Sequence, residues 1–349
     1  MRNLTTFVLT QSLAKPTGGQ IDRLVVMSYG IAARLRPRFL VRDRSVLTGH
    51  RQRDPQRFGL TVTDPTTGAP FEVAVFRYPG PPGAEQILGV HGFRGDHHGL
   101  ELIVDALKTY EVWVPDLPGF GVSGGMPAAE HSLEHYADII NQVAQHMRRP
   151  VLLGHSFGSV IAAAAVAAQT VNYPHVVFLN PIARPALEAA AVLDRAATRL
   201  TDAFYRACAA LPSALGRRLL GNKLVVWATG AFMTKTDDPR ILAYTHDQHQ
   251  AYFSGFQSPA TLLEAYRASI THTVADFAEN LSLPVTMIGG ADDELSSPED
   301  IAALADMIAG DDVETYVLPN TGHLMHYERP GAVAVLLMSR LSEHSHRGA

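Results

Sequence analysis

The sequence predicts an α/β fold, in which a mostly parallel sheet carries helices on both faces and is joined by an inserted helical cap. Short apolar runs alternate with helical patterns along most of the chain, as is typical of buried parallel strands joined by crossover helices. Between residues 183 and 280 this alternation stops and only helical patterns remain. A chain of 349 residues is long enough for one large domain with such an insertion.

The first part of the α/β domain is expected at residues 58–182. It opens with two alternating segments, FGLTVTD and FEVAVFRY, and the PTTGAP between them predicts a hairpin turn. Helical patterns follow at about 100–109 and 133–146, and a further helix is expected to begin at Phe157. The buried strands expected around these helices lie at 86–93, 111–116, 150–156 and 175–181.

Residues 183–280 are expected to form the cap. Ala-rich and amphipathic segments there are punctuated by prolines, and none resembles the preceding strands. The second part of the domain, residues 281–349, resumes the alternation and ends in a short polar tail. Its expected elements are strands at 283–290 and 313–319 and helices at about 298–308 and 330–341.

Composition narrows the choice of partner. The net charge of −5 and the lack of a Lys/Arg run in the sequence argue against a nucleic-acid partner. The single Cys208 excludes an intramolecular disulfide and a zinc site built from cysteines. We therefore expect a small-molecule substrate, whereas the oligomeric state is left open.

The N-terminal extension, residues 1–57, is basic. It holds eleven Lys and Arg residues against three acids, a net charge of +8, which leaves −13 for the remainder. It could dock on that acidic body, make a weak contact with an anionic membrane surface, or be disordered. Its apolar stretch 24–33 is too short to span a bilayer and is not followed by an A-x-A-like cleavage site, so we expect a cytoplasmic protein.

A candidate nucleophile lies in the G-x-S-x-G motif at residues 154–158, whose serine is Ser156. The motif directly follows the apolar run VLLG and directly precedes the alanine-rich pattern SVIAAAAVAA. A sharp strand-to-helix turn of this kind presents the serine outward, and its glycines let the strand and helix approach each other. The context, more than the five-letter motif, indicates a nucleophile elbow.

A serine nucleophile needs an imidazole that takes its proton. The base is expected in a loop after a late strand, on the same edge of the sheet as Ser156. His323 qualifies, because it follows the run VETYVLP and the turn Asn-Thr-Gly, and His326 is its nearest rival. A carboxylate that orients the imidazole should follow the run VTMIGG, where Asp293 is favoured and Asp292 is the alternative.

The negative oxygen that forms during acyl transfer needs backbone donors aimed at it. The amide of Phe157, directly after the nucleophile, is one candidate. The other lies in the loop HGFRG after the run at 86–93, where Phe93 is favoured and Arg94 is next. His91 in the same loop is expected to stabilise the loop rather than to act in catalysis.

Five segments of the chain together suggest a known family: HGFRG (91–95), DLPGFGVSG (116–124), GHSFGS (154–159), GGADD (289–293) and TGHLMHYERP (321–330). In this order they resemble the α/β-hydrolase superfamily, and within it the serine-nucleophile, cap-bearing, esterase-like branch. The resemblance spans about residues 58–342 and implies an eight-stranded-type sheet, with residues 183–280 as a lid over the substrate pocket. It gives no counterpart for residues 1–57.

Superfamily membership alone does not choose the reaction. The leading hypothesis is a carboxylic ester hydrolase that acts on a small, apolar substrate through an acyl-enzyme at Ser156. Hydrolysis of carbon–carbon or amide bonds, acyl transfer and perhydrolysis use the same triad and stay open. A non-catalytic relative that only binds a ligand is an alternative of a different class. Such a protein would not need a base and an acid at the positions that catalysis requires, and this sequence has both. Dehalogenases and epoxide hydrolases of the superfamily carry an aspartate where this sequence has serine.

Two groups of histidines are expected to be structural. We expect His97 and His98, which follow Asp96, to lie in a polar loop rather than to bind a metal. The H-x-x-H pair His246 and His249 lacks the adjacent glutamate of a zinc motif, so we expect a solvated cap helix there. The serine mechanism needs no metal or cofactor, and we expect neither.

Overall fold

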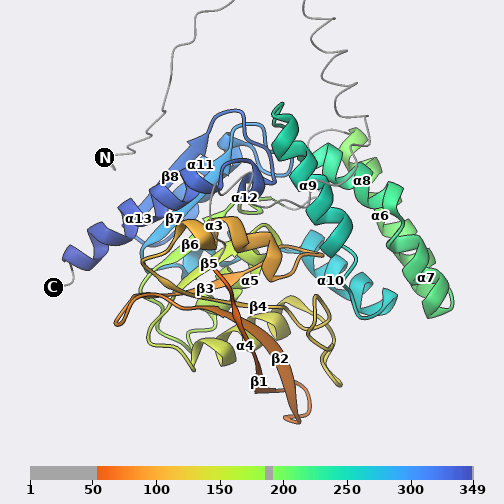
Figure 1. Ribbon diagram of the computed structural model, residues 1–349, viewed down its shortest axis with the longest axis horizontal. Helices are drawn as coiled ribbons and strands as arrows, with labels where there is room; N and C mark the ends of the chain where they lie inside the picture. The colour runs from red at the N-terminus through yellow and green to blue at the C-terminus, as the bar shows by residue number, and fades with distance from the viewer. Residues whose placement is uncertain (1–52, 185–191, 348–349) are drawn as a thin grey trace, which may run out of the picture.

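The computed structural model describes residues 53–184 and 192–347, which build a sheet in the order β1-β2-β4-β3-β5-β6-β7-β8 (Figure 1). β1 pairs antiparallel with β2 and β2 with β4, whereas the other neighbours run parallel. The mostly parallel eight-stranded sheet predicted from the sequence is confirmed. Its strands are β1 (Gln56–Thr63), β2 (Pro70–Tyr78), β3 (Gln86–Val90), β4 (Glu111–Pro115), β5 (Val151–His155), β6 (Val176–Leu179), β7 (Val285–Gly290) and β8 (Val313–Leu318).

Helices cover both faces of the sheet because both faces of its central strands are apolar. Alternate residues of a strand point to opposite faces. Leu152 accordingly packs in one core cluster with α4 (Leu133–Ala144), α5 (Phe157–Ala167) and α11 (Pro298–Met307). The next residue, Leu153, packs in the second cluster with α3 (Glu101–Ala106) and α13 (Pro330–Arg347). The predicted helices on both faces are thus confirmed.

Five helices of the insertion lie together beside the sheet, on the right of Figure 1. Prolines mark two of their beginnings, at the first turns of α9 and α10, where a missing N–H costs least. α9 and α10 contact elements of the α/β domain, and α6, α7 and α8 lie outside them. These helices are α6 (Val192–Ala210), α7 (Ser213–Leu220), α8 (Lys223–Met233), α9 (Pro239–Tyr252) and α10 (Pro259–Thr271).

The short helix η3 (Val274–Asn280) closes the insertion but belongs to the α/β domain by its packing. It contacts α5 and α11, and its Val274 and Ala278 are buried in the same cluster as those helices. The helices that face the carboxyl ends of the strands therefore end at Thr271, nine residues before the predicted end of the cap at 280.

The chain enters the domain at Arg53, inside the predicted extension 1–57. The Arg53 guanidinium donates to five backbone carbonyl oxygens at 2.7–3.0 Å, and its amide donates to the Asp105 carboxylate. β1 then begins at Gln56, two residues before the predicted boundary. The rest of the extension, and with it the choice between self-docking and membrane contact, lies outside the described residues.

Among the described residues, no helix combines the length and the apolar character needed to cross a bilayer.

Candidate active site

Ser156 sits in the sharp turn between β5 and α5, as the motif predicts. Its φ of 55° and ψ of −123° lie in a region that non-glycine residues rarely adopt. The turn is held by the Ser156 amide, which donates to the Leu179 carbonyl oxygen of β6 at 3.0 Å. Strain of this kind persists only where the surrounding structure imposes it, and it is typical of functional sites.

The two glycines of the motif are required by close backbone contacts. A Cβ on Gly154 would lie 2.2 Å from the Gly158 carbonyl oxygen, and a Cβ on Gly158 would lie 2.2 Å from that of Val90. No side chain can move aside to relieve these contacts, since the opposing atoms belong to the backbone. The motif thus lets α5 pack directly on β3 and β5.

Replacing Gly158 by alanine is expected to lower the free energy of unfolding by about 3 kcal/mol, because overpacking a rigid contact forces the backbone to shift. Gly124→Ala is the matched control, since a Cβ there meets no atom within 4 Å. Urea denaturation of both variants measures the difference. Equal stability of the two variants would contradict the close contact at Gly158.

The structure brings Ser156, His323 and Asp293 together in one hydrogen-bonded row. His323 Nε2 lies 2.7 Å from Ser156 Oγ, and His323 Nδ1 lies 2.9 and 3.1 Å from the two carboxylate oxygens of Asp293. Because the carboxylate only accepts, Nδ1 carries the proton and Nε2 is free to accept from the serine hydroxyl. Asp292, the alternative acid, is exposed and makes no contact with His323.

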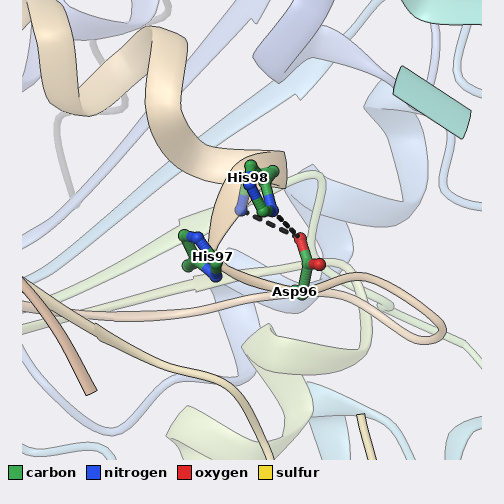
Figure 2. A group of neighbouring side chains, drawn as sticks. All are labelled: Asp96, His97 and His98. Atoms are coloured by element: carbon green, nitrogen blue, oxygen red, sulfur yellow. Dashed lines mark hydrogen bonds and ion pairs between the residues drawn. The ribbon is translucent and has the colours of Figure 1, made fainter. Parts of the chain in front are cut away.

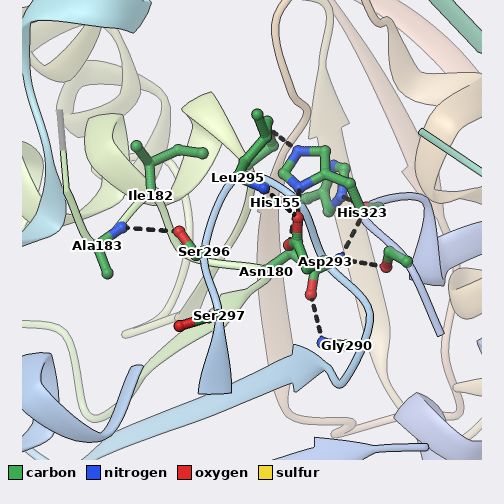
Figure 3. Close-up of polar contacts among 12 residues, drawn as sticks. His155, Asn180, Ile182, Ala183, Gly290, Asp293, Leu295, Ser296, Ser297 and His323 are labelled. Carbon is green, nitrogen blue, oxygen red and sulfur yellow. Dashed lines mark hydrogen bonds and ion pairs between the residues drawn. The ribbon is translucent and has the colours of Figure 1, made fainter. Parts of the chain in front are cut away.

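Asn180 holds the loop that carries His323 in place, and its only sequence signal is that it is a polar residue at the end of a predicted strand. Its Nδ2 donates to the carbonyl oxygens of Gly322 at 3.0 Å and His323 at 2.7 Å, and its Oδ1 accepts from the Gly290 amide at 2.8 Å (Figure 3). The ends of β6, β7 and the His323 loop are therefore tied together at one point.

His326, the rival base, lines the same cavity as Ser156, but its ring contacts His155, whereas His323 is hydrogen-bonded to Ser156. His326 lies in the short helix α12 (Met325–Glu328), with its Nδ1 3.1 Å from Nε2 of His155. The same His155 nitrogen donates to the His323 carbonyl oxygen at 3.1 Å. Burial lowers the pKa of both rings, that of His155 to about 3, so both are neutral at pH 7.

The two expected oxyanion donors, Phe93 and Phe157, line the same cavity as Ser156. Within the described part of the chain, neither amide donates to another backbone group. His91 holds the Phe93 loop in place. Its Nε2 accepts from the Leu117 amide at 3.0 Å, so its Nδ1 carries the proton and donates to the Gly92 carbonyl oxygen at 2.9 Å. Both ring nitrogens of His91 are thus hydrogen-bonded to backbone groups, so His91 stabilises the loop, as expected from the sequence.

Arg94 connects the same loop to the cap. It has a left-handed φ of 61°, and its buried guanidinium donates to the Phe253 carbonyl oxygen at 3.1 Å and the Tyr205 hydroxyl at 3.0 Å. It also donates to the Leu220 carbonyl oxygen at 2.9 Å. All three partners belong to the cap, so the position of the Phe93 amide depends on how the cap is seated.

A cavity of about 800 Å³ lies between the α/β domain and the cap, with Ser156 and His323 in its wall. Most of its lining surface is apolar, and the lining comes from both parts of the chain. Polar side chains also reach the cavity, among them His155 next to Ser156. The apolar lining includes Phe93, Ile182, Tyr205, Phe232, Tyr266, Ile270 and Leu324, and the polar lining includes Arg184, Gln248 and Glu294.

Asp96, His97 and His98 lie close enough to suggest a metal site, but their contacts explain their position (Figure 2). His98 Nδ1 is 2.9 Å from the Asp96 carboxylate, and His97 Nδ1 is 2.8 Å from that of Asp116. The His98 ring also stacks on Tyr252 of α9 at 3.6 Å between centroids. The group thereby joins the loop after β3 to the cap.

The expectation of a solvated helix at His246 and His249 is wrong for His249. α9 is an inner helix of the cap, and the His249 ring is buried, stacked on Phe253 at 4.9 Å between centroids. Burial lowers its pKa to about 3. The continuous polar run THDQHQ at 245–250 conceals this buried face from sequence analysis.

Acid is expected to destabilise the protein because the rings of His155 and His249 are buried and neutral. Below pH 6.5 the unfolded chain binds protons on histidines that the folded protein keeps neutral down to about pH 3. The free energy of unfolding should therefore fall between these pH values. Urea midpoints recorded across that range should fall less steeply for His249→Gln than for wild type. The exposed His146→Gln should keep the wild-type slope, and an unchanged slope in His249→Gln would contradict the buried neutral ring.

The comparisons with known proteins agree with this architecture. Residues 87–336 match the alpha/beta hydrolase family, and the chain belongs to that family. It is thus a hydrolase by family and fold. No curated relative matches the sequence.

Solved structures with the same fold share little sequence with the chain. An esterase from Thermogutta terrifontis has a TM-score of 0.66 at 22% identity, covering 83% of this chain and 99% of its own. An esterase from Exiguobacterium antarcticum has a TM-score of 0.63 at 17% identity, covering 82% and 100%. A haloalkane dehalogenase from Bradyrhizobium elkanii has a TM-score of 0.63 at 16% identity, covering 85% and 99%. At these identities the likeness establishes the fold alone.

Proposed function

We propose that the protein is a carboxylic ester hydrolase that forms an acyl-enzyme at Ser156. The observation that carries the proposal is the hydrogen-bonded row from Ser156 Oγ through His323 to Asp293, in the wall of a largely apolar cavity. A serine, rather than an aspartate, at the elbow favours acyl transfer over the displacement chemistry of dehalogenases. The two esterases of the same fold are in line with this reaction.

His323 Nε2 takes the proton from Ser156 Oγ as that oxygen attacks the ester carbonyl carbon. Asp293 keeps the proton of His323 on Nδ1 and stabilises the imidazolium that forms. The amides of Phe93 and Phe157 donate to the oxyanion, and each such donor contributes about 3 kcal/mol to transition-state stabilisation. The imidazolium then protonates the departing alcohol, and water, deprotonated by His323, releases the acid from Ser156.

The cavity favours an apolar acyl or alkyl group. A volume of about 800 Å³ accommodates a molecule larger than a short-chain ester. Most of its lining surface is apolar, so burial of apolar surface supplies most of the binding free energy. We therefore propose a substrate with a medium or long apolar group rather than a small charged one.

A panel of p-nitrophenyl esters of increasing acyl length tests this proposal. We expect kcat/KM to rise with acyl length beyond acetate until the cavity is filled. The matching p-nitroanilides distinguish ester from amide hydrolysis, and they should be turned over far more slowly. No turnover of any ester, with the protein folded, would contradict the proposed function.

A further inference from the structure

The outer helices of the cap expose apolar side chains in helical register. Of the eight large apolar side chains that are exposed in the described part of the chain, five lie on α6, α7 and α8. Leu215 and Leu219 are one turn apart on α7. Leu224 and Phe232 are two turns apart on α8, 74% and 58% exposed, with the exposed Ala228 between them. Exposed apolar side chains gathered on neighbouring segments are candidates for contact with a partner.

The same helices are basic on an otherwise acidic protein. Residues 203–236 contain five Lys and Arg residues and no acid, whereas residues 58–349 as a whole carry −13. Arg206 and Lys235 are paired with Asp202 and Glu294. The other three, Arg217, Arg218 and Lys223, are exposed and form no ion pair with any residue the structure describes.

The apolar stripe on α8 leads to the active site. Phe232, at the end of the stripe, is both exposed and part of the cavity wall. Its neighbour Met233 and Thr229, one turn earlier, also line the cavity. A molecule in contact with the outer face of α8 is therefore next to a wall of the cavity that contains Ser156.

We propose that α7 and α8 dock the protein on an anionic lipid surface. Exposed leucines and a phenylalanine beside unpaired Lys and Arg are the combination that an amphipathic helix uses at such a surface, where the apolar side chains enter the acyl boundary and the cations meet phosphates. The corollary that an acyl ester enters the cavity from the lipid phase rests on the proposed function. The docking itself does not.

Other occupants of this surface fit its charge less well. A symmetric pair of caps would place Arg217 and Arg218 of one copy against the same patch of the other, because a two-fold interface uses one surface twice. The N-terminal extension carries +8 and would be repelled. The phosphates of a nucleic acid would pair with the cations, but they would not bury the exposed side chains of Leu224 and Phe232.

Vesicle sedimentation of the full chain tests the docking. The Ser156→Ala background prevents hydrolysis of lipid, and the vesicles contain phosphatidylcholine alone or with one third phosphatidylglycerol. We expect binding to the anionic vesicles only. The triple variant Arg217→Gln, Arg218→Gln, Lys223→Gln should bind about tenfold more weakly or worse, since each cation near the surface adds to the attraction. The double variant Leu224→Ser, Phe232→Ser should lose binding similarly.

Matched controls carry the same changes elsewhere on the surface. Lys108→Gln with Arg148→Gln and Arg149→Gln, and Met307→Ser with Val335→Ser, replace exposed residues of the α/β domain and should bind as the parent does. Circular dichroism checks that every variant is folded.

Three results would overturn the docking proposal. They are a parent that binds no anionic vesicle, cap variants that bind as the parent does, and a parent that self-associates through Leu224 and Phe232 instead. With Ser156 restored, the triple variant should hydrolyse a soluble short ester at the parent rate. Lack of ester turnover in that parent would contradict the proposed function and leave the docking result unaffected.

Discussion

Replacing Ser156 by alanine is expected to lower ester hydrolysis by about 10⁴-fold or more, because removing the nucleophile of a triad disables its base and acid as well. His323 Nε2 then has no hydroxyl to deprotonate, although the cavity and the oxyanion donors remain. KM should change far less than kcat, since Ser156 contributes little to substrate binding. Steady-state kinetics with the best ester of the acyl-length panel measure both.

Ser342→Ala is the control for this change, because Ser342 is exposed on α13, away from the cavity lining. It should keep the parent kcat and KM. A Ser156→Ala enzyme with undiminished turnover would show that another residue attacks the substrate.

Replacing Asp293 by asparagine is expected to lower kcat by about 10⁴-fold, because an amide no longer holds the proton of His323 on Nδ1. The asparagine amide can donate to Nδ1, which moves the ring proton to Nε2. A protonated Nε2 cannot accept the proton of the Ser156 hydroxyl. The side chain keeps its size, so the fold and the substrate affinity should be retained.

Asp292→Asn is the matched control, one residue away and exposed. It should retain nearly full activity. Equal losses in both variants would indicate a general disturbance of the loop after β7, and a loss in Asp292→Asn alone would reverse the assignment of the acid.

The sheet and the row of Ser156, His323 and Asp293 follow from local sequence signals. Apolar runs define buried strands, and parallel strands present their carboxyl ends at one edge of a sheet. A residue placed just after β5, β7 or β8 therefore reaches that edge whatever the details of packing. This is why the approximate strand bounds, and the positions of these three residues after their strands, could be predicted.

The supporting contacts could not be predicted, because they join residues far apart in the chain. Asn180 and the Gly322 carbonyl oxygen are 142 residues apart, and Arg94 and Leu220 are 126 apart. No local pattern indicates which carbonyl oxygen a buried amide or guanidinium will reach. The depth of His249 likewise depends on how α9 is seated between the sheet and the outer helices.

The cap connects the two proposals. Arg94 and His98 join the loop that carries the Phe93 amide to the cap, through contacts with α6, α7 and the end of α9. Its outer helices carry the surface proposed for lipid. Contact at the outer face could therefore influence the oxyanion donors through the seating of the cap, and kinetics in the presence of anionic vesicles would detect such an influence.

Labelling with a fluorophosphonate tests the central claim most directly, because the reagent reacts with a serine only when a base and oxyanion donors activate it. The account predicts one label per chain, on the peptide that contains Ser156, and no label on the Ser156→Ala variant. An unlabelled native protein, or a label that persists in Ser156→Ala, would contradict it.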